Sequence, residues 1–135
     1  LGTYNWAVRE MKERAEIMAS RVALLRELLS ATISNIRINT LVSQSLPNIL
    51  NISFLDAEKL DGESILQSLD IQGIAASNGS ACVSGSLQPS HVLSAMGLPA
   101  AEARAAVRFS VSKDTTEAEI LTAAQALAEI LAALR

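Results

Sequence analysis

Apolar residues recur every three or four positions from about Tyr4 to Ser30, and charged residues fill most of the positions between them. This spacing predicts an amphipathic helix with one buried stripe. Helices of globular proteins average about 11–12 residues, so this helix is long, and we expect its first turns to pack against something absent from this chain. The expected buried stripe consists of Ala7, Met11, Ala15, Met18, Val22, Leu25 and Leu29.

Alternating apolar and polar residues predict strands further along the chain. A short strand is expected at 36–38 and a stronger one at 49–55. The short apolar run at 73–76, flanked by turn formers, predicts a buried strand. Residues 106–111 alternate again and predict the last strand.

Capping residues mark the other helices. Asp61 is suited to N-cap a helix that runs to about Leu69, and prolines begin two short helices expected at 89–97 and 99–105. Thr116 with Glu119 three residues later forms a capping box for a closing helix. The buried stripe expected on that helix consists of Ile120, Ala124, Leu127, Leu131 and Leu134.

This order of elements predicts a single α/β domain that spans residues 1–135. We expect a small sheet of three to four strands with helices packed mainly on one face. Half of the residues are apolar, which is enough to bury one core. The sequence contains no internal repeat.

Composition excludes several classes of function. The net charge is −3, basic residues are scattered, and the aromatic residues are one Trp, one Tyr and two Phe, so a nucleic-acid partner is not expected. No apolar run approaches the roughly 18 residues of a membrane span, and no signal peptide is apparent. We therefore expect a cytoplasmic protein without a membrane partner. One Cys and one His cannot form a disulfide framework or a zinc site.

Cys82 is the strongest candidate for chemistry. It lies in a stretch of small polar residues, 77–88, that predicts a mobile loop. A lone cysteine is most often a small buried residue, but Asn78, Gly79 and Gly85 are loop formers and favour an exposed thiol. Its thiolate is a strong nucleophile with affinity for sulfur.

Arg108 is the second candidate. Alternation along its strand places it on the face opposite Val107 and Phe109, and a guanidinium binds a carboxylate through two hydrogen bonds. Taken alone, a strand arginine is more often solvated or ion-paired on the surface.

Other residues are weaker candidates. His91 is the only histidine and is a candidate base for Cys82, but it is expected in the first turn of a helix, where an exposed structural role is commoner. Arg104 is expected to be a surface charge. The serines of 80–84 lack the elbow motif of a serine hydrolase, and the glycines of 79–85 fit neither phosphate-binding motif.

The segment SNGSACVSGSLQPSHVL at 77–93 closely resembles the active-site loop of cysteine desulfurases that have the long form of this loop. The resemblance continues through the sequences AMG at 95–97, VRFS at 107–110 and TTEAEI at 115–120. It implies that residues 1–135 are the C-terminal small domain of such an enzyme, a type I enzyme dependent on pyridoxal phosphate.

The resemblance also implies roles for residues and partners. The family releases sulfur from L-cysteine, leaves alanine, and holds the sulfur as a persulfide. Cys82 takes the nucleophile's position and Arg108 that of the arginine that binds the substrate α-carboxylate. The loop would deliver sulfur to an iron–sulfur scaffold or a tRNA-thiolation relay, and the parent protein would be a homodimer.

The chain departs from the family in what it lacks. Pyridoxal phosphate needs a lysine for its Schiff base, and none of Lys12, Lys59 and Lys113 occurs in the family's Ser-x-His-Lys context. We therefore expect that the large cofactor-binding domain is absent, and that this chain alone binds no pyridoxal phosphate and is inactive. Val83 and Gln88 replace the Thr and Glu that are common in relatives.

Three alternatives stay open. In the first, the chain is a non-catalytic sulfur carrier or docking module that receives a persulfide from a partner. In the second, it is part of a selenocysteine lyase or of another type I enzyme. In the third, Cys82 is incidental to an ordinary α/β domain.

Overall fold

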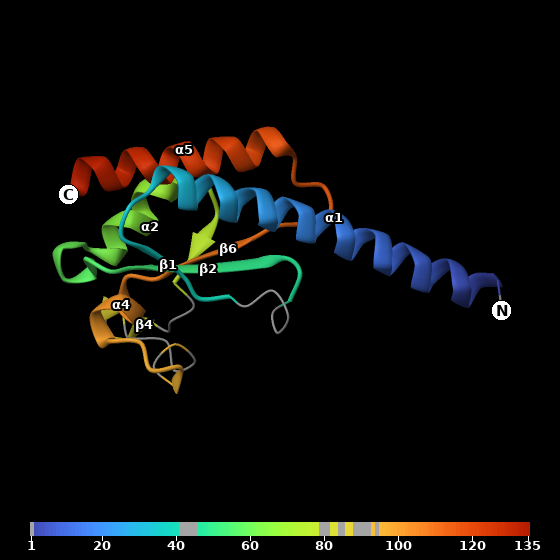
Figure 1. The fold of residues 1–135 in the computed structure, drawn as a ribbon, viewed down its shortest axis with the longest axis horizontal. Coiled ribbons are helices and arrows are strands. Elements are labelled where there is room, and N and C mark those ends of the chain that lie inside the picture. The colour runs from blue at the N-terminus through green and yellow to red at the C-terminus, as the bar shows by residue number, and fades with distance from the viewer. Residues whose placement is uncertain (1, 41–45, 79–81, 84–85, 88–92, 94) are drawn as a thin grey trace.

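The computed structural model describes residues 2–40, 46–78, 82–83, 86–87, 93 and 95–135. Its elements in chain order are α1 (Gly2–Thr32), β1 (Ile36–Ile38), β2 (Ile49–Phe54), the 3-10 helix η1 (Ala57–Lys59), α2 (Gly62–Ile71), β3 (Ala76–Ser77), β4 (Cys82–Val83), β5 (Ser86–Leu87), α4 (Ala100–Arg104), β6 (Val107–Ser110) and α5 (Glu117–Leu134). Figure 1 shows α1, α2 and α5 on one side of the sheet and α4 on the other. The predicted α/β class with helices mainly on one face is confirmed.

The main sheet has four antiparallel strands in the order β1-β2-β6-β3. Leu50 lies opposite Phe109 and Ile52 opposite Val107, and directly opposite residues project from the same face. All four are buried, with Phe54, beneath the helix layer. The helices contribute Leu25, Leu29, Ile65, Leu69, Leu127 and Leu131 to this core.

The end of α2 corrects the predicted strand at 73–76. Asp61 caps α2 as predicted, because its side chain accepts a hydrogen bond from the Glu63 amide. At the other end Gly73 has a φ of 79°, its amide donates to Asp70, and the Ile74 amide donates to Leu69. This Schellman arrangement uses Gly73 to end the helix, so β3 starts only at Ala76.

The apolar stripe predicted along α1 is buried only in the C-terminal half of the helix. Leu25 and Leu29 are buried, but Met11 is 69% exposed and Trp6 is 64% exposed. Figure 1 shows the reason, since the first turns of α1 extend past the sheet and α5. None of the helices in the described part of the chain has the length and apolar character needed to cross a membrane.

The other predicted helices are largely confirmed. The capping box of Thr116 and Glu119 is present, and four of the five predicted stripe positions on α5 are buried. Leu134 is 39% exposed, because it lies in the last turn beside an open hollow. The helix predicted at 99–105 is α4. Most of the one predicted at 89–97 lies outside the described residues; Gly97, its predicted end, has a φ of 88°.

Arg135 ties the end of α5 to the first turn after β2. Its Nε donates to Asp56 Oδ2 at 2.8 Å and its Nη2 to Asp56 Oδ1 and the Ser34 carbonyl, each at 2.9 Å. The hydrogen bond from Arg135 lowers the pKa of Asp56 below its usual value. The carboxylate form of Asp56 therefore stabilises the folded chain.

We expect Asp56→Asn to lower the free energy of unfolding at pH 7 by about 1 kcal/mol, because it removes one charge of a two-point ion pair. The folded-state pKa is lowered, so this contribution is complete above the unfolded value of about 3.9 and is lost as pH falls through the folded value. Urea denaturation at pH 7 and near pH 3 measures the difference. Exposed Glu58→Gln is the control, and an equal Asp56→Asn effect at both pH values would contradict the assignment.

Candidate functional site

Arg108 lies on the face of the sheet that points away from α1, α2 and α5. Its neighbours Val107 and Phe109 are buried in the core, and Arg108 itself is exposed. This confirms the predicted alternation along β6. Across the sheet Arg108 lies opposite Asn51 of β2 on one side and Ser77 of β3 on the other. The guanidinium thus belongs to a polar row on the second face of the sheet.

The polar row continues to the edge of the sheet through two amides. Asn39 Nδ2 donates to Asn51 Oδ1 at 2.8 Å, and Ser53 Oγ donates to Asn39 Oδ1 at 3.4 Å. Ser53 is fully buried and Asn39 is 8% exposed. Because buried polar groups are costly without partners, these bonds explain how this face tolerates a polar row. Asn51 thereby holds a fixed position beside Arg108.

The two arginines of this face differ in their partners. Arg37 of β1 lies 3.4 Å from Glu102 of α4, a carboxylate that is almost buried. Within the described residues the guanidinium of Arg108 has no hydrogen bond and no ion pair. Of these two, Arg108 is therefore the one whose guanidinium is available to an external carboxylate.

Cys82 lies in a small hairpin rather than in a loop without secondary structure. In β4 its backbone pairs with Leu87 of β5, and Figure 1 places β4 on the same side of the sheet as α4. Residues 79–81, 84–85 and 88 lie outside the described residues, so the predicted mobility and exposure of the thiol stay predictions. The predicted loop is wrong for residues 82–83 and 86–87, because these form the paired strands β4 and β5.

Chain connectivity limits how far Cys82 lies from Arg108. Ser77 is directly opposite Arg108, at about 5 Å between Cα atoms. The five steps from Ser77 to Cys82 extend at most about 18 Å. The Cα atoms of Arg108 and Cys82 therefore lie within about 23 Å of each other.

Asn78 is a site residue that sequence reasoning missed. We predicted a loop former, but Asn78 is only 3% exposed. Its Nδ2 donates to the carbonyls of Arg104 at 2.6 Å, Ala106 at 2.8 Å and Ala103 at 3.4 Å. These acceptors lie more than twenty residues away in sequence, so no local pattern could have indicated them.

The lysines of the chain do not form a cofactor site. Lys12 is in α1, Lys59 in η1 and Lys113 in the turn after β6, and all three are exposed. None is carried by a strand of the polar face with Arg108. A lysine that forms a Schiff base with a group bound at Arg108 would have to lie beside that face, and no strand of the main sheet carries one.

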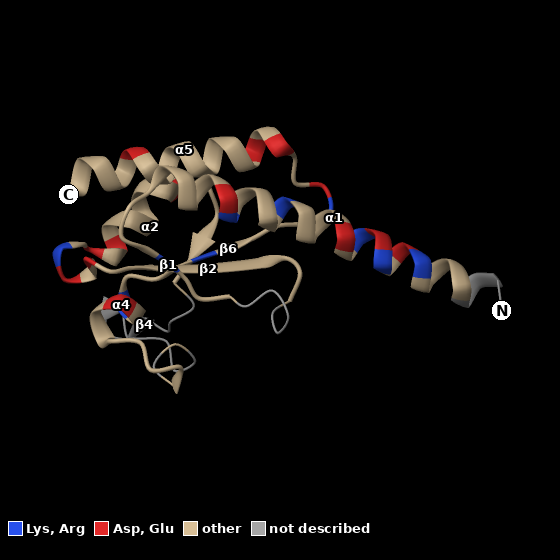
Figure 2. Ribbon diagram, in the orientation of Figure 1, with Lys and Arg blue, Asp and Glu red and all other residues tan. Residues whose placement is uncertain are grey.

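The remaining candidates contribute little. Arg104 is exposed, as predicted for a surface charge, and His91 lies outside the described residues. Among the described side chains, no group of three potential metal ligands occurs. Figure 2 shows acidic and basic segments interspersed along α1 and acidic ones alone on α5.

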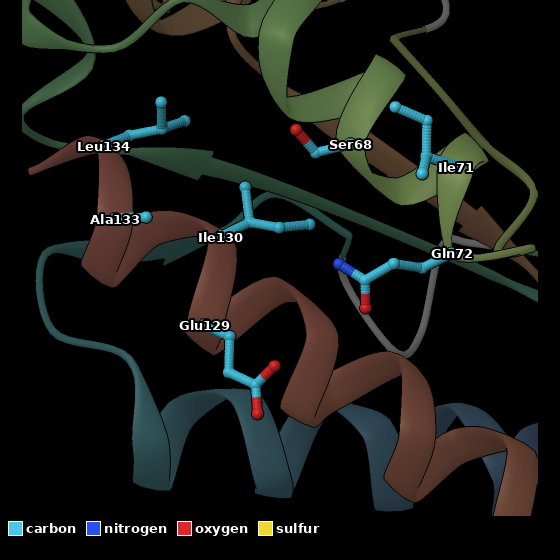
Figure 3. Close-up of a pocket in the computed structure, with 7 residues that line it drawn as sticks. All are labelled: Ser68, Ile71, Gln72, Glu129, Ile130, Ala133 and Leu134. Carbon is cyan, nitrogen blue, oxygen red and sulfur yellow. The ribbon is translucent and has the colours of Figure 1, made fainter.

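An open hollow lies on the helix layer, away from Arg108. Figure 3 shows that side chains of α2 and α5 form its walls. They are Ser68, Ile71, Gln72, Glu129, Ile130, Ala133 and Leu134. With one carboxylate among mainly aliphatic side chains, this hollow has no pair of acid and base groups.

Comparison with known proteins identifies the family. Residues 5–122 match the aminotransferase class-V family, and the chain therefore belongs to it. A cysteine desulfurase of Trichormus azollae is 48% identical over 111 residues. The cysteine desulfurase NifS of Azotobacter vinelandii is 52% identical over 90 residues. These similarities confirm the resemblance to cysteine desulfurases.

The relatives are considerably longer than this chain. The matches cover 82% of the chain but 27% of the Trichormus azollae protein, and 67% against 22% for the Azotobacter vinelandii protein. Among solved structures, a NifS-like protein superimposes with a TM-score of 0.74 at 30% identity, and covers 93% of this chain and 30% of that one. A NifS-like protein of Rickettsia africae gives 0.70 at 27% identity, and covers 89% of this chain and 29% of that one.

The segment that Asn78 binds is also held from the helix side. A Cβ added at Gly62 would lie 2.8 Å from Ala105 Cα and 2.9 Å from the Arg104 carbonyl oxygen. Only glycine lets the start of α2 approach the turn between α4 and β6 this closely. The turn before Arg108 is therefore fixed on two sides.

We expect Gly62→Ala to lower the free energy of unfolding by roughly 1–3 kcal/mol, because backbone atoms must move to admit the methyl group. Helix propensity alone favours Ala over Gly by about 1 kcal/mol, so a gain in stability would contradict the close approach. Urea denaturation measures the change. Gln67→Ala, at an exposed position of the same helix, serves as the control.

Proposed function

We propose that this chain is the thiol-bearing part of a cysteine desulfurase. Cys82 takes the sulfur of L-cysteine as a persulfide, alanine is left, and Arg108 binds the carboxylate of the amino acid. The observation that carries this proposal is Arg108, an exposed strand arginine without a carboxylate partner among the described residues. Membership of the class-V aminotransferase family and the desulfurase relatives support it.

The position of Arg108 suits carboxylate recognition. It is on a strand that lies between two others in the sheet, so its backbone is held on both sides. A bidentate guanidinium–carboxylate pair fixes the orientation of the substrate as well as its position. The amide of Asn51 and the hydroxyl of Ser77 surround it with neutral polar groups that do not compete for its charge.

Cys82 supplies the nucleophile. Its thiolate attacks the sulfur atom of the substrate, and a sulfur–sulfur bond forms while the carbon–sulfur bond of the substrate breaks. The electron pair of the broken bond stays on the carbon, which takes up a proton and becomes the methyl group of alanine. The persulfide on Cys82 then passes its outer sulfur to the thiol of an acceptor protein. We propose an iron–sulfur scaffold or a thiolation relay as the acceptor.

The cofactor of the complete enzyme would be held elsewhere. The family implies pyridoxal phosphate in the parent protein, and the three lysines of this chain do not fit a Schiff base beside Arg108. We therefore propose that the rest of a longer parent, in the form of a homodimer, binds pyridoxal phosphate, and that this chain alone neither binds it nor turns over cysteine.

The second candidate is a sulfur carrier that never cleaves cysteine. In that reaction a donor persulfide transfers its outer sulfur to the Cys82 thiolate and leaves as a thiolate. The availability of Arg108 favours the desulfurase, because a carrier that receives sulfur from a protein has no amino-acid carboxylate to bind.

We expect Cys82 to gain one sulfur atom when the chain is incubated with a complete cysteine desulfurase and L-cysteine. Intact-mass spectrometry before and after reduction measures the gain. Cys82→Ser should gain none, because the serine hydroxyl forms no persulfide. Failure of the unaltered chain to accept sulfur would sink both sulfur-handling functions.

We expect Arg108→Gln in the full-length protein to raise the KM for L-cysteine about 10–100-fold, because a charged hydrogen-bonded pair contributes about 1.5–3 kcal/mol. Alanine formation at varied cysteine concentration measures this. The matched control is Arg104→Gln, which removes an exposed arginine nearby and should change KM less than about twofold. Equal effects of the two variants would refute the role of Arg108.

A further inference from the structure

We infer that Asn78 is a positioning residue that fixes the point from which the Cys82 segment leaves the sheet. This inference rests on the proposed function, because it concerns the delivery of the Cys82 thiol. Asn78 directly follows Ser77, the residue paired with Arg108. It precedes Cys82 by four residues, so the two Cα atoms are separated by at most about 14 Å.

The three carbonyls that Asn78 binds belong to the turn that leads into Arg108. The Arg104 and Ala106 carbonyls accept at 2.6 Å and 2.8 Å and the Ala103 carbonyl at 3.4 Å. One side chain at the end of β3 thus crosses to the end of α4 and the start of β6. The departure point of the Cys82 segment is thereby tied to the strand that carries Arg108.

The nitrogen of the Asn78 side-chain amide, and not its oxygen, makes the hydrogen bonds of this side chain. Its Oδ1 is buried without a hydrogen-bond partner among the described residues, which is unfavourable for a buried acceptor. The stabilising contacts of this side chain are therefore those of Nδ2. An isosteric carboxylate at this position would oppose three carbonyl oxygens and release the anchor.

The turn is otherwise well supported, so loss of Asn78 should act locally. Gly62 packs against Ala105 from the other side, and β6 keeps its pairing with β2. Arg108 should hence stay in place, while the segment that leads to Cys82 loses its fixed start. Loss of Asn78 should therefore impair delivery of the thiol while binding of the substrate carboxylate by Arg108 is retained.

Distance measurements test the anchor without reference to activity. Cys82 is the only cysteine, so a second spin label at Ser110→Cys, an exposed position of β6, reports the separation of the Cys82 segment from that strand by double electron–electron resonance. We expect Asn78→Asp to broaden the distance distribution and Asn78→Ser, which keeps one donor, to broaden it less. An unchanged distribution in a folded variant overturns the inference.

Kinetics of the full-length protein test the consequence for reaction. We expect Asn78→Asp to lower kcat for alanine formation about tenfold, the factor that corresponds to fixing the backbone of one residue, with KM changed less than about twofold. Thr116→Ala removes the cap of α5 and destabilises the fold, and it should leave kcat and the label distances unchanged.

The outcomes separate the two proposals. A broadened distribution with unchanged kcat overturns the positioning role and leaves the desulfurase function intact. Absence of alanine formation by the unaltered full-length protein overturns the desulfurase function, and because delivery of the thiol then has no reaction to serve, it also overturns the positioning role. In that case a broadened distribution still identifies Asn78 as a structural anchor.

Discussion

The burial of Val107 and Phe109 between the sheet and the helix layer is the constraint on which the rest of the structure depends. β6 lies between β2 and β3, and its two apolar side chains meet Ile52 and Leu50 across the strand pair. Because successive residues of a strand point to opposite faces, burying these two forces Arg108 and Ser110 to the other face. The position of the guanidinium thus follows from the packing of the core.

The second face of the sheet is built by a different means. It carries Asn39, Asn51 and Ser53 in place of aliphatic residues, and hydrogen bonds among these side chains satisfy them. A sheet face of this kind gains little from the hydrophobic effect, and its organisation rests on directional contacts. Ion pairing of Arg37 with Glu102 adds to this by holding α4 against the same face.

Local patterns predicted much of this fold and only part of the site. The strand of Arg108 and the caps of α2 and α5 follow from residues within four positions of each other, which is why they were predictable. Asn78 was not, because its burial depends on carbonyls that only the folded chain brings to it. The prediction of a strand from Gly73 was wrong for a related reason. A glycine after an apolar helix suits the start of a strand as well as the end of a helix, and the hydrogen bonds of the Gly73 and Ile74 amides to the last turn of α2 show that it ends the helix.

The exposed half of α1 shows what periodicity does and does not predict. Met11 repeats in phase with Leu25 and Leu29, yet the first is exposed and the others are buried. The pattern identifies the face of a helix that suits burial, while the partner is set by what lies within reach of that turn. The same distinction between the direction of a side chain and its partner applies to Arg108. Its strand fixes the direction of the side chain, and the lack of an intramolecular carboxylate among the described residues leaves its charge to be matched from outside. A site of this kind is defined jointly by a rigid element and by a partner that the surrounding residues do not supply.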